Sequence, residues 1–193
     1  MHKRIGLMLA TIHQGSGIAL WRAVSKEAKK RDDTTLFVFP GGRLNYLKDN
    51  EYLRNEVFSL VNSTNIDSSI VWASSLTGKV DYNQVGEYIR KINEDLPVVA
   101  MGMSIAGIPS VDFNAYSGFF NEVDHLIRVH GCKKIAMVRG PESHPSAEAR
   151  FEAYKSALKE NGIAYDANLV ATPCAWAEGN KAIRELIEDR HLT

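Results

Sequence analysis

Most of the polar side chains that can hold a small molecule follow directly after the predicted strands of this sequence. They offer hydroxyl, amide, imidazole and guanidinium groups, which suit hydrogen bonding to a polar ligand. In open α/β sheets the ligand lies in the crevice at the carboxyl ends of the strands. The candidate ligand-binding residues are His13, Gln14, Ser16, Gly42, Arg43, Ser74, Ser75, Asn114, Tyr116, Glu142, Arg150 and Trp176.

Two tryptophans add apolar faces to this polar set. Trp21 and Trp176 can stack on a sugar ring or a base, and packing in the core is the alternative for each. The sequence therefore favours a ligand that combines a ring with several polar groups.

Motifs for catalysis and for cofactors are missing from the sequence. It contains no Gly-x-Ser-x-Gly, His-Glu-x-x-His or Cys-x-x-Cys string, and no complete phosphate-binding loop. Gly15-Ser16-Gly17 can present N–H groups to an anion, but a helix capped by Ser16 is the alternative. His125, His130 and Cys132 do not share one helix face, which favours a solvated helix end over a metal site. We expect neither an enzyme, nor a cofactor, nor a metal.

Strand and helix patterns alternate along the chain. Continuous apolar runs predict strands and residues at helical spacing predict helices. The predicted strands are 5–10, 36–39, 69–73, 97–101, 108–113, 134–138 and 168–172, and the predicted helices are 17–31, 50–61, 82–93, 116–130, 146–161 and 178–189.

This alternation predicts an α/β fold with doubly wound parallel sheets. The change of pattern near residues 105–115 predicts two lobes, an N-terminal lobe over 1–113 and a C-terminal lobe over 114–193. The second lobe has only two predicted strands, too few to complete a core. We therefore expect a truncated second lobe and a longer parent protein.

Composition agrees with a globular protein. The 193 residues are 45% hydrophobic and 24% charged, and 23 basic residues balance 23 acidic ones. This balance argues against direct contact with nucleic acid, and no apolar run is long enough for a membrane span. Cys132 and Cys174 are far apart in sequence, which predicts free thiols in a reducing compartment, the cytoplasm.

Several short segments in a fixed order resemble the ligand-binding core of LacI/GalR-type regulators, which has the type I periplasmic-binding-protein fold. The segments are Pro97-Val98-Val99, Gly107-Ile108-Pro109-Ser110-Val111, His125-Leu126-Ile127, His130-Gly131, Lys134-Ile135-Ala136, Arg139-Gly140-Pro141 and Arg150-Phe151-Glu152-Ala153-Tyr154. The resemblance implies two lobes with a ligand in the cleft between them and a homodimer in which helices of the N-terminal lobe pair. It also implies that Arg150 contacts ligand hydroxyls, with a plain surface arginine as the alternative.

A narrower resemblance concerns the first lobe. Leu20-Trp21-Arg22-Ala23-Val24, Phe39-Pro40-Gly41-Gly42 and Arg54-Asn55-Glu56-Val57 resemble sensor modules that precede bacterial histidine kinases or diguanylate cyclases. Our first expectation is therefore the sensor part of a signalling protein that binds a sugar-like or nucleobase-like molecule. The effector core of a LacI-type transcriptional regulator is the alternative. An exported solute-binding protein and an enzyme of the doubly wound class are more distant ones.

One departure from the family pattern concerns the predicted junction of the lobes. The family often has Asp-Asn-Arg there, whereas this chain has Asn114-Ala115-Tyr116, which lacks the charges. The sequence therefore leaves the identity of the ligand open.

Overall fold

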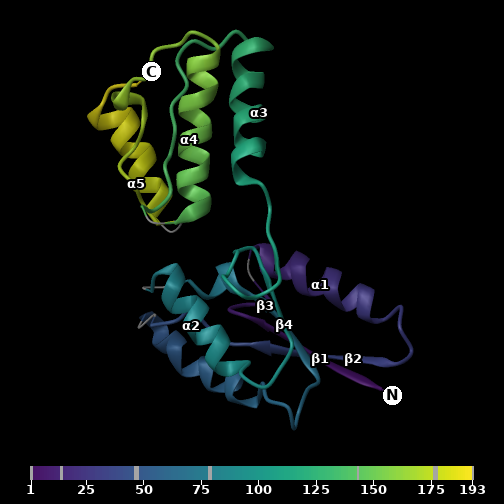
Figure 1. Cartoon of the computed structure of the whole chain (residues 1–193). Helices are drawn as coiled ribbons and strands as arrows, with labels where there is room; N and C mark the ends of the chain where they lie inside the picture. Colours follow the sequence, from purple (N-terminus) through teal and green to yellow (C-terminus); the bar gives the residue numbers. More distant parts are fainter. Residues whose placement is uncertain are drawn as a thin grey trace. The chain divides into compact units, whose positions relative to one another are not determined.

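The computed structural model describes most of the chain (Figure 1). The described residues are 2–13, 15–45, 48–77, 80–142, 144–175 and 178–192, except for the side chains of 48, 49 and 51. The chain divides into two compact units, Met1–Phe113 and Asn114–Thr193. No helix in the described ranges is long and apolar enough to cross a membrane.

The first unit is built on a five-stranded sheet in which every neighbouring pair is parallel. Its strands are β1 (Lys3–Leu9), β2 (Thr34–Pro40), β3 (Ser68–Trp72), β4 (Val98–Met101) and β5 (Ser110–Val111). The spatial order is β2-β1-β3-β4-β5, so the chain reverses its direction across the sheet between β1 and β3. Loops after two such neighbouring strands diverge and leave a crevice at the carboxyl end of the sheet.

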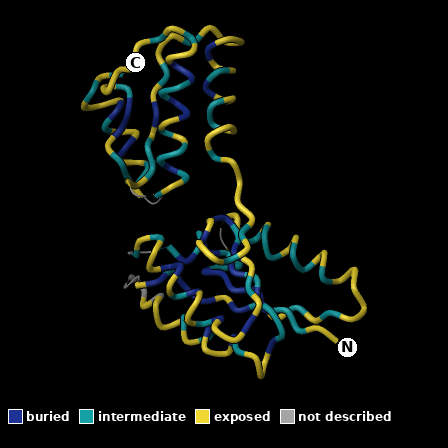
Figure 2. The backbone as a smooth tube through the Cα atoms, in the orientation of Figure 1, coloured by how far each residue is buried: buried dark blue, intermediate teal, exposed yellow. Residues whose placement is uncertain are grey.

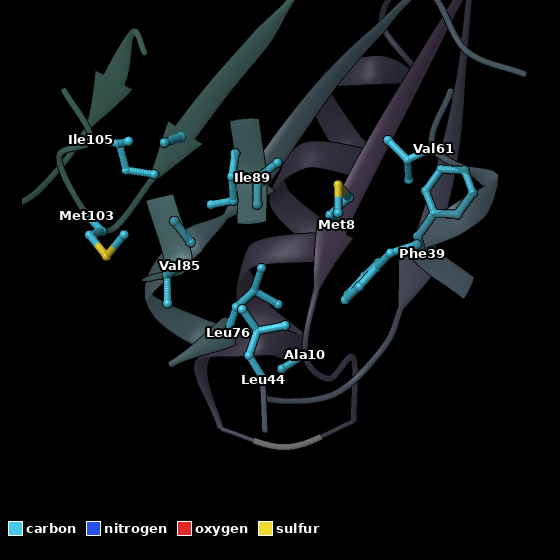
Figure 3. Packing of buried hydrophobic residues seen from close by; sticks show 14 of the residues in the cluster. Met8, Ala10, Phe39, Leu44, Val61, Leu76, Val85, Ile89, Met103 and Ile105 are labelled. Carbon is cyan, nitrogen blue, oxygen red and sulfur yellow. The ribbon is translucent and has the colours of Figure 1, made fainter. Parts of the chain in front are cut away.

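Helices cover the two faces of this sheet. They are α1 (Ser16–Ala28), the 3₁₀ helices η1 (Lys48–Leu60) and η2 (Ala73–Leu76), and α2 (Tyr82–Ile92). On one face Met8 of β1 packs with Val85 and Ile89 of α2 in the main core (Figure 3). On the other face Val24 and Ala28 of α1 line a cavity of about 480 Å³ over the strands. The predicted α/β fold with a parallel sheet is thus confirmed.

The second unit is mainly helical. It contains α3 (Ala115–Arg128), α4 (Pro145–Glu160), the 3₁₀ helix η3 (Ala167–Leu169), α5 (Gly179–Arg184) and the π-helix η5 (Glu185–Asp189). Ile127 of α3 packs in one buried cluster with Tyr154 and Leu158 of α4. Both helices have buried and exposed sides (Figure 2). Ala182 and Leu186 form a smaller cluster with Ala171.

The two strands predicted for 134–138 and 168–172 are reduced to one parallel bridge between Met137 and Val170. The Met137 N–H donates to Leu169 O at 2.8 Å, and the Ala171 N–H donates to Met137 O at 2.9 Å. Residues 167–169 instead form η3, because the Asp166 carboxylate accepts from the Asn168 N–H at 2.9 Å. The local cap therefore competes with the short ladder and shortens it.

Candidate functional site

The segments that follow β1, β2 and β3 carry the predicted ligand-binding residues of the first unit. They include His13, Ser16, Gly42, Arg43, Ser74 and Ser75. Gln14 lies outside the described residues. Parallel strands bring these loops to one edge of the sheet, where ligands of open α/β sheets bind.

The hydrogen-bonding groups of Ser75 and Gly42 already have partners within the protein. The Ser75 hydroxyl accepts from the Ala10 N–H at 3.1 Å and donates to Trp72 O at 2.7 Å. The Gly42 N–H donates to Asn55 Oδ1 at 2.8 Å. Both groups therefore tie neighbouring loops together, and we assign them a positioning role.

Ser74 and Trp72 keep hydrogen-bonding capacity at the end of β3. Within the described part of the chain, neither the Ser74 hydroxyl nor the Trp72 indole N–H has a hydrogen-bond partner. Both lie against Gly102, where an added Cβ would approach Ser74 Oγ to 2.4 Å and Trp72 Nε1 to 3.0 Å. Gly102 also has a φ of +70°, so the absence of a side chain there lets both groups sit against the backbone.

Trp72 is a residue that the sequence prediction missed. It is half-buried and ends β3, directly before the 3₁₀ turn that holds Ser74. It ends an apolar strand run close to Ser74 and Ser75 in sequence, and that position could have drawn attention to it. The strand predicted over 69–73 includes Trp72, so the strand pattern masked the indole as a candidate.

The turn between β1 and α1 differs from the prediction. Ser16 is the first residue of α1, and Gly15, with a φ of 53°, is its N-cap without a side-chain hydrogen bond. The prediction that Ser16 caps the helix is therefore wrong, because the chain needs a left-handed residue at the cap. An added Cβ on Gly17 would lie 2.3 Å from Thr11 O, so only glycine fits this close turn.

Trp21 fixes the same turn from the first turns of α1. Its indole N–H donates to Ile12 O at 3.0 Å. The predicted stacking role for Trp21 thus competes with a structural one. His13, one residue further, is exposed, and its Nδ1 lies 3.4 Å from Thr11 Oγ1, at the outer limit of a hydrogen bond.

In the second unit Asn114 and Tyr116 lie at the start of α3. The Asn114 side chain accepts from the Ser117 N–H at 2.9 Å and caps the helix. Tyr116 is exposed and stacks on Phe120, with ring centroids 6.2 Å apart. The cap uses the Asn114 oxygen, whereas the Tyr116 ring presents an open face.

Arg139 is a second residue that the sequence prediction passed over. Its Nη2 donates to both carboxylate oxygens of Glu148, at 2.8 and 3.0 Å, and its guanidinium lies 4.1 Å from the centre of the Phe151 ring. Nη1 lies 3.7 Å from Glu142, and the side chain is only 15% exposed. Arg139 therefore fastens the first two turns of α4 to the preceding segment. Its place directly after a predicted strand could have drawn attention to it.

Arg150, by contrast, is exposed on α4. The part of the chain described here offers it no hydrogen bond and no ion pair. Its positive charge acts on His144: burial lowers the pKa of that imidazole, and Arg150 lowers it further. As far as the described residues go, the Arg150 guanidinium thus keeps all of its donors for another molecule. The remaining predicted residue, Trp176, lies outside the described residues.

Metal-binding groups do not assemble in the described ranges. No set of three His, Cys, Asp or Glu side chains there could hold an ion. The rings of His125 and His130 pack edge to face at 5.0 Å, and Cys132 and Cys174 are free cysteines. Burial raises the pKa of the Cys174 thiol, and Glu178 and Glu185 raise it further, which makes it a poor nucleophile.

Comparison with known proteins finds regulators of transcription. The HTH-type transcriptional repressor CytR of Escherichia coli K12 is 29% identical over 98 residues, which are 49% of this chain and 28% of that repressor. The solved structure of the regulator CcpA of Lactococcus lactis matches with a TM-score of 0.74 at 26% identity, over 100% of this chain and 66% of that chain. A LacI family regulator from Enterococcus faecium with bound ribose matches with a TM-score of 0.67 at 19% identity, over 97% and 63%. No protein-family profile matches the chain.

These likenesses confirm the resemblance to the ligand-binding core of LacI/GalR-type regulators and its periplasmic-binding-protein-like fold. The chain spans 28% of the curated repressor and 66% of the CcpA chain. They support the core of a transcriptional regulator better than a sensor that precedes a histidine kinase or a cyclase.

Proposed function

We propose that this chain is the effector-binding core of a LacI/GalR-type transcriptional regulator, without catalytic activity, that works in the cytoplasm. Its effector is a small polar molecule with a ring, of the sugar or nucleoside class. The observation that carries this proposal is Arg150, a helix arginine whose guanidinium has no partner in the described part of the chain. A guanidinium matches vicinal hydroxyls or a carboxylate through paired N–H groups.

Groups in the first unit support the same class of ligand. Trp72 and Ser74 place an indole and a hydroxyl with unused hydrogen-bonding capacity at the carboxyl end of β3. Aromatic rings stack on sugar rings and bases, and hydroxyls distinguish their polar edges. The ribose held by the Enterococcus faecium regulator supports a sugar as the first probe, since that protein has the same fold.

Thermal shift with the protein expressed from the complete reading frame tests this proposal. Ribose, glucose, adenosine and cytidine serve as probes, and we expect one class to raise the melting temperature. Arg150→Ala should remove most of that shift and leave the melting temperature without ligand unchanged. Arg184→Ala, which removes another exposed arginine at the end of α5, is the matched control and should keep the full shift.

A shift that Arg150→Ala leaves intact would return Arg150 to a plain surface charge. No shift with any probe would contradict the ligand class. The complete reading frame decides the output: an N-terminal helix-turn-helix supports the regulator, and a C-terminal kinase or cyclase domain would contradict it.

We also propose that the chain forms a homodimer, as cores of this type do. Sedimentation at micromolar concentration should show a species of twice the 21.5 kDa chain mass. A single species at the chain mass would contradict this part of the proposal.

A further inference from the structure

The helix that follows β2 is an unusually long 3₁₀ helix. η1 (Lys48–Leu60) runs for 13 residues, whereas 3₁₀ helices seldom exceed about three or four residues, because their hydrogen bonds are poorly aligned. The spacing of Leu53, Val57 and Leu60 predicts an α-helix instead. A long 3₁₀ stretch often marks a hinge or a sequence under strain. The sequence of η1 and its observed backbone thus favour different helices.

The 3₁₀ form leaves two apolar side chains of η1 in water. A 3₁₀ helix turns about 120° per residue and an α-helix about 100°. Leu53 and Leu60 therefore point about 120° apart in the 3₁₀ form and would point about 20° apart in an α-helix. They are 54% and 51% exposed. An α-helix would gather both leucines on one face with Val57.

Three residues at intervals of three hold the observed form. Asn55, Phe58 and Val61 lie on one line, because side chains at i and i+3 eclipse in a 3₁₀ helix. The Val61 N–H donates to Phe58 O at 3.0 Å and so continues the i→i−3 pattern beyond η1. Phe58 and Val61 are buried, and Asn55 Oδ1 accepts from the Gly42 N–H at 2.8 Å. In an α-helix each step of three residues turns the line by about 60°, so the three residues could not keep these places together.

The same line holds the segment after β2. Asn55 Nδ2 also donates to Arg43 O at 3.4 Å. An added Cβ on Gly41 would lie 2.4 Å from Phe58 Cζ and 2.9 Å from Asn55 Oδ1, so the backbone there rests directly on these two side chains. Conversion to an α-helix would also shorten the element from about 26 Å to about 20 Å. Either change would loosen residues 41–43.

We propose that η1 is a two-state element, in which the 3₁₀ form holds residues 41–43 in place and an α-helical form releases them. The 3₁₀ form buries Phe58 and Val61, whereas the α form gathers Leu53 and Leu60 on one side, so the two forms compete through different apolar contacts. The regulatory consequence rests on the proposed function: a ligand that contacts residues 42 and 43 of the predicted site favours the 3₁₀ form. The two states themselves need no ligand.

Paired histidines that bind Zn²⁺ distinguish the two forms. Tyr52→His with Glu56→His, four residues apart, needs an α-helix, since the side chains are about 40° apart there and about 120° apart in a 3₁₀ helix. Leu53→His with Glu56→His, three residues apart, is eclipsed in the 3₁₀ form. All three positions are exposed. Saturating Zn²⁺ should therefore speed amide hydrogen exchange of Gly42 about tenfold or more in the first pair and leave it slow in the second.

This measurement uses the protein expressed from the complete reading frame. The wild type with the same Zn²⁺ is the control for the six native histidines. Equal exchange of Gly42 in the two Zn²⁺-bound pairs would show that the type of helix does not control residues 41–43. A pair three residues apart that fails to bind Zn²⁺ would show that η1 is not a 3₁₀ helix in solution. Either result would refute the proposal.

The backbone at Asn50 gives a test without metal. Asn50 has a φ of 53°, which an α-helix excludes. Asn50→Ala penalises that conformation and should favour the α form, so exchange of Gly42 should become faster. Asn50→Gly accepts a positive φ and should keep the wild-type rate. An unchanged rate in Asn50→Ala would refute the switch, whereas failure of every sugar and nucleoside probe to bind would contradict the proposed ligand class and leave the switch standing.

Discussion

Removing the Glu148 carboxylate should destabilise α4 more than removing the guanidinium that it binds. The Arg139 side chain is 15% exposed, so Glu148→Ala leaves a positive charge largely out of water. The other acid that the described residues place near it, Glu142, lies 3.7 Å away and is 72% exposed. Arg139→Met leaves Glu148, 38% exposed, able to be hydrated, and the methionine keeps an apolar contact with Phe151.

The magnitudes follow from these exposures. Truncating one partner of a fully buried pair costs about 3–5 kcal/mol, and an exposed pair is worth about 0–1 kcal/mol. Arg139, at 15% exposure, is close to the buried case, and Glu148, at 38% exposure, is closer to the exposed case. We therefore expect about 1.5–2.5 kcal/mol for Glu148→Ala and about 0.5–1 kcal/mol for Arg139→Met, between those bounds. The double variant should resemble Arg139→Met, because it contains no orphaned charge.

Amide hydrogen exchange of residues 145–160 measures these differences, since about 1.4 kcal/mol of local unfolding free energy changes the rate tenfold. Glu152→Ala is the control on the same helix. It removes an exposed ion pair to Lys155 and should cost less than about 0.5 kcal/mol. If Arg139→Met destabilised α4 more than Glu148→Ala, or if the two losses simply added, stacking on Phe151 rather than charge pairing would hold the helix.

Three further outcomes are expected. Gly102→Ala should cost about 1–3 kcal/mol through its positive φ and close neighbours, whereas Gly118→Ala, in open space on α3, should add about 0.5–1 kcal/mol; melting temperatures should move in opposite directions. Arg150→Gln should raise the pKa of His144 in an NMR titration. In the wild type the pKa of His144 is lowered in the folded state, so the free energy of unfolding should fall as the pH drops below about 6.5, the ordinary value of histidine. Tyr154→Phe should lose about 1 kcal/mol with the bond to Ile135 O. It should also remove a phenol whose pKa burial raises to about 12. The neutral phenol of Tyr154 contributes stability that is fully present below about pH 10 and is lost as the pH rises toward about 12.

Much of the first unit follows from hydrophobic periodicity. The run Ile5–Ala10 predicts a strand buried on both faces, and β1 lies inside the sheet, between β2 and β3. Asp81 and Gln84 form a capping box at the start of α2, a local signal that sequence can supply. The two strands predicted in the second unit are longer than the single bridge that forms there. A strand needs neighbouring strands to pair with, and the apolar pattern of one segment does not show whether such neighbours exist.

The candidate site was less predictable, since its hydrogen bonds join distant residues. The Ser75 hydroxyl accepts from the Ala10 N–H, 65 positions away, and nothing near Ser75 in sequence predicts that hydrogen bond. Asn114 is different, because a cap before a helix is readable from its neighbours. That the two compact units act as lobes around one ligand, and that the twelve predicted residues line its site, stay predictions.

The two arginines of the second unit show what decides between structure and recognition. Arg139 and Arg150 are the same residue type, and sequence position made Arg150 the candidate. Arg139 has its charge matched by Glu148, its face covered by Phe151 and its Nε buried without a partner in the described part of the chain. A ligand could use it only by breaking those contacts, at the cost of an orphaned carboxylate. Among the described residues Arg150 has no such contacts to lose, so the full strength of a charge-assisted hydrogen bond is available to a ligand there. The same reasoning ranks Ser74 above Ser75, which already holds two hydrogen bonds. Recognition in this chain should therefore rest on polar groups that the fold leaves without partners.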